Sequence, residues 1–317
     1  MIIAVDTGNK QVKTEHFNFI SGVSQYSVVP TTVVPGDYMK YRGKYYVLSS
    51  QREEYLRDKS KSERYFVLSL LGIVKELDYQ CDQGSLSYEK DRVYSITLLC
   101  GLPPAHMEDG SLRKNFKSYF RMKEPEKVTF KGRVWNIRVS KVEVYAQCYA
   151  AIMTIYPKIK DYPRVLGIDI GGFTADYMML KLGHIDIENT DSMENGVILL
   201  YRHIKRECAK KYDAIIEESD VDEILQGHVE MYENEIVGTV RGCAENFVEK
   251  LLASFRELQI DLKNCYVVFM GGGSLILQEF IEKSPLLKKY MLLEEINANV
   301  MGYEFLYKVS QRRKSGR

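Results

Sequence analysis

One short pattern occurs twice in this chain, and it constrains the fold more than any other feature. In residues 1–13 an apolar, mostly β-branched run ends in Asp6 before a glycine turn, and in residues 165–176 a similar run ends in Asp169 before two glycines. Such runs are typical of buried strands, and glycine lets the chain reverse tightly. An Asp at a strand tip beside exposed backbone N–H groups suits a phosphate-bound divalent cation. The duplication predicts two similar half-molecules facing each other across one nucleotide.

A third glycine turn follows an apolar run in residues 266–270. It contains Gly271, Gly272 and Gly273, and Ser274 is suited to cap the helix expected next. Consecutive glycines allow very close approach of the backbone to a flat or anionic ligand. One such turn alone is a weak signal, but three in this order are far more specific.

Length, net charge and cysteine pattern limit the classes of protein to which this chain can belong. A chain of 317 residues can form two domains, and a net charge of +1 provides no general attraction to nucleic acid or membrane. The six cysteines are scattered without a C-x-x-C pair, as in reduced cytoplasmic proteins, so a structural zinc is not expected. No apolar run approaches the roughly 20 residues of a membrane-spanning helix. These properties predict a cytoplasmic protein.

Periodicity in the sequence predicts a mixed α/β chain. Helical spacing favours helices over residues 62–77, 111–120, 142–156, 196–211, 220–226, 235–254, 275–283 and 299–307. Strands are expected over residues 1–6, 17–19, 26–34, 93–99, 165–170, 177–182, 184–191 and 266–270, with a break at Pro35-Gly36 and hairpins around residues 42–43, 131–132 and 182–183. A polar, proline-bounded joint at residues 157–163 indicates the domain boundary.

The three turns resemble the nucleotide-binding loops of the actin, Hsp70 and sugar-kinase superfamily. Asp6-Thr7-Gly8 with Lys13 is similar to its first phosphate loop, Asp-x-Gly-x-x-x-x-Lys. Residues 169–176 resemble the second phosphate loop, and residues 271–274 resemble the adenosine loop.

The segments between the loops are also similar to that superfamily. Residues 141–151 and 297–302 resemble its two connecting helices. The resemblance implies an actin-like ATPase fold of the α/β class, with two similar RNase H-like α/β domains flanking a nucleotide cleft.

Domain boundaries follow from the same resemblance. Domain I is expected over residues 1–160, with a small subdomain inserted at about 31–80. Domain II is expected over residues 161–317, with a small subdomain at about 196–265. A C-terminal helix at about 299–310 is expected to pack back on domain I.

The resemblance implies roles for the acidic residues and their neighbours. Asp6 and Asp169 are expected to hold Mg²⁺ through its bound waters, because magnesium loses its waters reluctantly. Lys13 is expected to reach the β- and γ-phosphates. Gln147, placed on the first connecting helix, is expected to align the attacking water. A neutral amide is a poor proton acceptor, so hydrolysis is expected to be slow.

ATP or ADP is the implied ligand, with GTP as an alternative nucleotide. The expected contacts are Thr7, Gly8, Asn9, Lys13, Gly171, Gly172, Phe173, Thr174, Lys205, Glu207, Gly271, Gly272, Gly273 and Ser274. Backbone N–H groups of the first two loops would bind phosphate oxygens. Lys205 and Glu207 would flank adenine and ribose, or else form an exposed charged helix face. Asp176 would assist catalysis or act as a hydrogen-bonding residue at a strand end.

Within the superfamily the chain is most similar to the bacterial plasmid-segregation actins of the ParM group. This similarity implies a filament that polymerises with ATP, disassembles after hydrolysis and moves plasmid DNA. The expected partners are other copies of the chain and an adaptor protein bound to centromere-like DNA, without direct contact to nucleic acid or membrane. Exposed loops at residues 36–43 and 227–237 are candidate subunit contacts. A sugar-type kinase and a cell-shape or division actin remain alternative functions.

Overall fold

The computed structural model describes residues 1–31, 33–34, 36, 38–50 and 56–316, and it divides into two compact units. Unit 1 comprises Met1–Thr154 and Asn299–Arg317, and unit 2 comprises Ile155–Ala298. The predicted break at Pro35-Gly36 and the candidate contact loop at residues 36–43 include Pro35 and Asp37, which lie outside the described residues. The same holds for parts of the small subdomain predicted at residues 31–80.

Unit 1 is built on one curved sheet with the strand order β3-β2-β1-β7-β9-β8-β5-β6-β4. Its strands are β1 (Ile2–Thr7), β2 (Gln11–Lys13), β3 (Asn18–Ile20), β4 (Val23–Tyr26), β5 (Tyr38–Tyr41), β6 (Lys44–Leu48), β7 (Val93–Leu102), β8 (Glu126–Phe130) and β9 (Arg133–Ala146). β7 pairs in parallel with both β1 and β9, and the other pairs are antiparallel.

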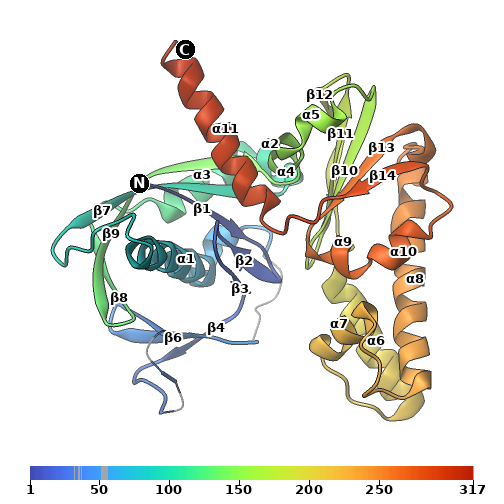
Figure 1. Ribbon diagram of the computed structural model, residues 1–317, viewed down its shortest axis with the longest axis horizontal. Helices are drawn as coiled ribbons and strands as arrows, with labels where there is room; N and C mark the ends of the chain where they lie inside the picture. The colour runs from blue at the N-terminus through green and yellow to red at the C-terminus, as the bar shows by residue number, and fades with distance from the viewer. Residues whose placement is uncertain (32, 35, 37, 51–55, 317) are drawn as a thin grey trace. The chain divides into compact units, whose positions relative to one another are not determined.

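A long apolar helix fills the curve of this sheet. The helices of unit 1 are the 3-10 helix η1 (Lys59–Lys61), α1 (Glu63–Asp82), α2 (Pro104–Glu108), α3 (Gly110–Phe120), α4 (Tyr149–Thr154) and α11 (Ala298–Lys314). Strands β7, β9, β8, β6 and β4 curve around α1 (Figure 1). The Ser62 hydroxyl caps α1 by accepting the Arg64 N–H, and α1 buries most of its apolar side chains in the core of the unit.

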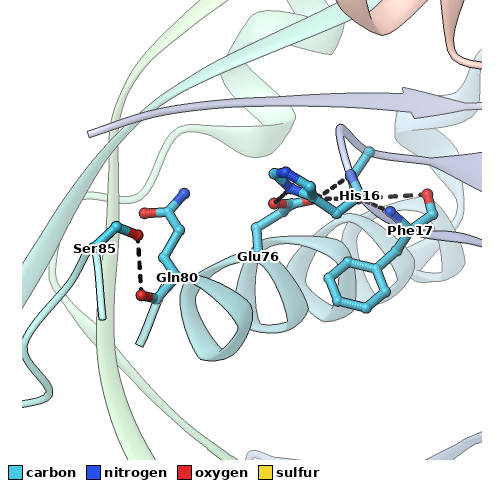
Figure 2. A network of polar contacts seen from close by, with 6 residues as sticks. His16, Phe17, Glu76, Gln80 and Ser85 are labelled. Atoms are coloured by element: carbon cyan, nitrogen blue, oxygen red, sulfur yellow. Dashed lines mark hydrogen bonds and ion pairs between the residues drawn. The ribbon is translucent and has the colours of Figure 1, made fainter. Parts of the chain in front are cut away.

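The turn between β2 and β3 is fixed to α1 by a buried glutamate (Figure 2). Glu76 Oε1 accepts hydrogen bonds from the Thr14 hydroxyl at 2.6 Å and the His16 N–H at 2.9 Å. Its other oxygen lies 2.8 Å from His16 Nδ1. Glu15, His16 and Glu76 could together ligate a metal. However, the contacts of Glu76 already explain it as an anchor that positions the first hairpin.

Unit 2 contains a second sheet with the order β12-β11-β10-β13-β14. Its strands are β10 (Arg164–Ile170), β11 (Ala175–Lys181), β12 (His184–Met193), β13 (Tyr266–Met270) and β14 (Lys289–Leu292). Its helices are α5 (Tyr156–Ile159), α6 (Val197–Tyr212), α7 (Glu218–Gln226), α8 (Asn234–Glu257), the 3-10 helix η2 (Leu262–Asn264), α9 (Gly272–Ile276) and α10 (Gln278–Glu282). Helices α6, α7 and α8 pack against one another (Figure 1).

The two sheets share a five-strand arrangement. In unit 1 the order β3-β2-β1-β7-β9 has two antiparallel pairs followed by two parallel pairs. In unit 2 the order β12-β11-β10-β13-β14 repeats these directions. Asp6 lies one residue before the end of β1, and Asp169 lies one residue before the end of β10. The repeated sequence pattern therefore marks the same position in two sheets of the same topology.

The three predicted hairpins are confirmed. Each turns through two residues with positive φ, as a two-residue hairpin with the favoured twist requires: Arg42-Gly43, Lys131-Gly132 and Leu182-Gly183. Turn residues next to alternating strands are thus a reliable local signal in this chain.

Several predicted elements are wrong. Among the described residues of the strand expected over 26–34, only Tyr26 lies in a strand, and β14 was not predicted. Residues 275–283 form the end of α9 and the separate helix α10 rather than one helix. Residues 142–156 do not form one helix, because β9 continues to Ala146 in parallel register with β7.

Across the described ranges, no helix combines the length and apolar character needed to cross a membrane.

Candidate functional site

The side chain of Asp6 is held at the end of β1 by a donor from another strand end. Gln147 Nε2 donates a hydrogen bond to Asp6 Oδ1 at 2.6 Å. Lys13 lies directly opposite Asp6 in the β1–β2 pair, so an acidic and a basic residue share one face of the sheet. Asp6 itself is only 4% exposed.

Two residues of α11 complete this environment. Asn299 Nδ2 and the Tyr303 hydroxyl each lie 3.4 Å from a carboxylate oxygen of Asp6. Gly101 makes the approach of Tyr303 possible, because a Cβ there would lie 2.0 Å from the tyrosine hydroxyl. These donors and the Gln147 amide are neutral, so they fix the carboxylate without cancelling its charge. An oriented carboxylate of this kind suits a hard cation such as Mg²⁺.

The predicted place of Gln147 on a helix is wrong. It lies between the end of β9 and the start of α4, and its N–H donates to the Leu102 carbonyl at 2.9 Å. The reason is the parallel pairing of residues 141–146 with β7, which keeps this segment extended. Gln147 therefore meets Asp6 at the carboxyl ends of β9 and β1, the two strands that flank β7 in parallel, where sites in α/β sheets commonly form.

The first turn, which joins β1 and β2 and contains Gly8, is tight, and side chains of η1 and α1 hold it by hydrogen bonds. A Cβ on Gly8 would lie 2.5 Å from the Gln11 carbonyl oxygen, so only glycine fits there. Lys59 Nζ donates to the Thr7 carbonyl at 2.7 Å, and the Tyr65 hydroxyl donates to Asn9 Oδ1 at 2.8 Å. Lys59 and Tyr65 were not among the residues predicted from the sequence, because a polar stretch around residue 59 has the composition of a solvated segment.

The second turn places two carboxylates side by side in unit 2. Asp169 on β10 is the direct cross-strand partner of Asp176 on β11, so both side chains lie on one face of the sheet. Like charges in such a pair repel each other. A divalent cation bound nearby would reduce this repulsion, which favours the interpretation of Asp169 as a cation-holding residue.

The loop between β10 and β11 has an internal hydrogen bond that limits how it can bind phosphate. The Gly171 N–H donates to the Thr174 carbonyl at 2.8 Å. This bond uses the Gly171 N–H, so it disfavours the expected contact of that N–H with phosphate, which stays a prediction. In this loop, the N–H groups of Gly172 and Phe173 stay predicted donors to phosphate oxygens.

The start of α6 supports this loop from behind. The N–H groups of Gly196, Val197 and Ile198 donate to the carbonyls of Phe173, Gly171 and Gly172 at 2.9–3.0 Å. These N–H groups at a helix start have no partner within their own helix. The helix N-terminus thus stabilises the loop rather than presenting its own N–H groups to a ligand.

The third turn packs directly against the second. Gly271 has φ +84° and ψ 159°, and a Cβ there would lie 2.2 Å from Asp169 Oδ1. A Cβ on Gly273 would lie 2.6 Å from the Ile170 carbonyl oxygen. These glycines are therefore required so that the Asp169 turn and the start of α9 can approach each other. Gly272 has open space around it.

Two expectations for the third turn are corrected. Ser274 does not cap α9, because the helix begins at Gly272 with Gly271 as its cap residue. Ser274 is fully buried, and its hydroxyl donates to the Met270 carbonyl at 2.5 Å. Its side chain therefore has a structural role, and the predicted contact between this side chain and adenosine is not supported.

Lys205 and Glu207 lie on α6 and form ion pairs with neighbours in unit 2. Lys205 Nζ lies 3.0 Å from Glu217, and Glu207 lies 3.3 Å from Lys211. These pairs favour the interpretation of this segment as a charged helix face. A contact with adenine or ribose stays a prediction.

Cys100 lies on β7 beside β1, and burial strongly raises the pKa of its thiol. A thiol that stays protonated is neither a nucleophile nor a ligand at neutral pH. The chemistry available near Asp6 is therefore that of carboxylates, amides, hydroxyls, lysines and backbone N–H groups.

A matching protein family and similar solved structures support the fold described above for this chain. Residues 167–283 match the family described as "Archaeal actin homologue MreB-like, C-terminal". No curated protein matches the sequence. An archaeal actin homologue in complex with ADP aligns with 98% of this chain and 99% of its own, at 17% identity and a TM-score of 0.72.

Two ParM structures are also similar over nearly their full length. A 15-stranded ParM filament from Clostridium botulinum aligns with 97% of this chain and 99% of its own, at 15% identity and a TM-score of 0.73. Apo ParM of pSK41 aligns with 98% of both chains, at 15% identity and a TM-score of 0.64.

The chain therefore has the fold of the actin-like proteins, as its turns predicted. Within that class it is similar to archaeal actin homologues and to ParM.

Proposed function

We propose that this protein is an actin-like nucleoside triphosphatase that binds ATP with Mg²⁺. The single observation that carries the proposal is the placement of Asp6 and Asp169 at the same position in the five-strand arrangement that the two sheets share. The ADP complex of a structurally similar archaeal homologue supports it. In this proposal residues 1–154 with 299–317 form domain I, and residues 155–298 form domain II.

The chemistry assigned to each residue is electrostatic. Asp6 and Asp169 would hold Mg²⁺ through its waters, and the ion would neutralise charge on the transferred phosphoryl group. Lys13 and the N–H groups of Gly8, Gly172 and Phe173 would bind phosphate oxygens. Phosphoryl transfer needs positioning and charge stabilisation more than covalent participation, so this set of groups is sufficient for slow hydrolysis.

Gln147 has two tasks in this proposal. Its amide nitrogen holds Asp6 at 2.6 Å, and its amide oxygen would accept a hydrogen bond from the attacking water. An amide can orient a water but is a poor base. The proposed enzyme is therefore a slow hydrolase, which suits a timer of assembly.

Gln147→Ala is expected to slow ATP hydrolysis about tenfold, because outer partners of metal-holding carboxylates contribute at least that much. Binding of ATP should persist, and any filaments formed should last longer. Single-turnover phosphate release and sedimentation over time measure both effects. Gln83→Ala, at an exposed position after α1, is the control. Unchanged release and disassembly in Gln147→Ala would remove the assigned role.

We further propose that the protein polymerises with ATP and disassembles after hydrolysis, and that its filaments segregate plasmid DNA through a DNA-bound adaptor. The similarity to a ParM filament supports self-assembly. In the candidate contact loop at residues 227–237, Met231 is 90% exposed, as an apolar residue at a subunit contact would be in the free chain. The six free cysteines are typical of a reducing compartment and support the proposed cytoplasmic location.

The deciding experiment is light scattering of the purified protein at micromolar concentration, with and without ATP and Mg²⁺, followed by electron microscopy. The proposal predicts scattering and filaments that depend on ATP and need no other substrate. ADP release that depends on an added sugar, without scattering, would instead identify a kinase. Absence of both ATP binding and scattering would reject the nucleotide function altogether.

A further inference from the structure

The segment that leads into α1 places a buried lysine against the first turn. Lys59 is only 3% exposed, although it lies on the short 3-10 helix η1. Its ammonium group donates to the Thr7 carbonyl at 2.7 Å and lies 5.3 Å from the Tyr65 ring centroid. Burying a lysine ammonium is costly, so its position next to a ligand-binding turn needs an explanation.

Peptide geometry connects this lysine to the ligand side of the turn. The described residues contain no cis peptide, so the unit between Thr7 and Gly8 is trans. In a planar trans unit the carbonyl and the following N–H point in opposite directions. A donor fixed on the Thr7 carbonyl therefore directs the Gly8 N–H away from Lys59. The positive charge also polarises this peptide and strengthens the N–H as a donor.

Tyr65 fixes the next part of the same turn. Its hydroxyl donates to Asn9 Oδ1 at 2.8 Å and accepts from Arg64 Nη2 at 2.6 Å. Tyr65 is fully buried, so this hydroxyl contributes a polar contact from inside the unit. Residues 59–65 thus contact the first turn at Thr7 and at Asn9, on either side of Gly8.

The Thr7 hydroxyl is a second feature of this turn that a bound ligand or an ordered water would explain. Thr7 has no measurable exposure, and its Oγ1 has no hydrogen-bond partner within the described part of the chain. A buried polar atom without a partner is uncommon, because it loses its hydrogen bonds to water. A bound phosphoryl oxygen or an ordered water would satisfy it.

We propose that Lys59 and Tyr65 are positioning residues that hold the first turn so that it binds the phosphoryl oxygens of a nucleotide. The inference rests on the proposed function and deepens it. Lys59 acts through the Thr7 carbonyl, and Tyr65 acts through Asn9. Neither residue was among the ligand contacts expected from the sequence.

The test compares Lys59→Met, Tyr65→Phe and the control Lys61→Met, which changes an exposed lysine of the same 3-10 helix. The full-length variants are titrated with ATP and Mg²⁺ by calorimetry, and hydrolysis is followed at several ATP concentrations. Lys59→Met is expected to raise the Kd and KM for ATP about 10- to 100-fold, as loss of a supporting partner does. The kcat should change less, because the contact is made before and during the reaction.

Rescue by a related side chain separates positioning from simple packing. Lys59→Arg keeps a charged donor and should recover part of the affinity that Lys59→Met loses. Tyr65→Phe removes only the hydroxyl and should weaken ATP binding several-fold without changing the circular dichroism spectrum. Lys61→Met should match the wild type.

The outcomes are distinct. A wild-type protein that does not bind ATP rejects the proposed function and this inference together. A wild type that binds ATP, with a folded Lys59→Met that binds equally well, overturns only the inference. Should Lys59→Met fail to fold, Tyr65→Phe decides: weaker binding supports the positioning role, and unchanged binding overturns it.

Discussion

Asp169→Asn is expected to reduce ATP hydrolysis by about 100- to 1,000-fold, the effect of removing one key electrostatic group from such a site. The substitution keeps the shape of the side chain next to Gly271 but removes its charge. It also removes one of the two like charges in the cross-strand pair with Asp176, so the thermal stability of unit 2 should change much less than the activity. Phosphate release and thermal unfolding measure the two effects separately.

The matched control is Asp161→Asn, which removes one exposed carboxylate from the same unit. It should leave both phosphate release and thermal unfolding unchanged. Normal turnover in Asp169→Asn, with Mg²⁺ still required, would show that this carboxylate does not hold the ion.

Gly271→Ala is expected to reduce turnover about 100-fold, because a displacement of reacting groups by about 1 Å can have that effect. The new Cβ would lie 2.2 Å from Asp169 Oδ1, so the carboxylate must move. The backbone of Gly271, at φ +84° and ψ 159°, is in a region nearly restricted to glycine, where another residue costs about 1–3 kcal/mol. A lower melting temperature should accompany the lost activity.

Gly272→Ala provides the comparison, because a Cβ on this adjacent glycine would meet no atom within 4 Å and the residue begins a helix. It should keep its stability, and its activity should fall only if the ligand approaches this glycine as closely as the sequence predicts. If both alanine variants lose activity equally, the ligand approaches Gly272 directly. If neither loses activity, the close contact between Gly271 and Asp169 has no functional importance.

Local signals predicted most of the site scaffold. Apolar runs that end in Asp6 and Asp169 do form the central strands, because burial of β-branched residues and the glycine turns after them point to the same structure. The third turn also forms as expected, and its glycines are required by close packing. These features depend on residues near one another in the sequence.

Features that depend on distant residues were not predictable in this way. Residues 141–146, before Gln147, have apolar positions that are compatible with either a helix or a strand. They form a strand because they pair with β7. Lys59 lies in a charged stretch, and nothing local distinguishes it from the exposed Lys61. Asn299 and Tyr303 are one helical turn apart, which places them on one face of a helix but does not identify Asp6 as their partner.

The contacts of Asp6 with α11 have a consequence for biosynthesis. Asn299 is separated from Asp6 by 293 positions, yet both belong to unit 1. While the chain is being translated, the amino-terminal segment of this unit lacks two of the donors that orient its carboxylate. The environment of the Asp6 carboxylate is therefore complete only after residues 299–303 have been synthesised and have folded onto the sheet of unit 1.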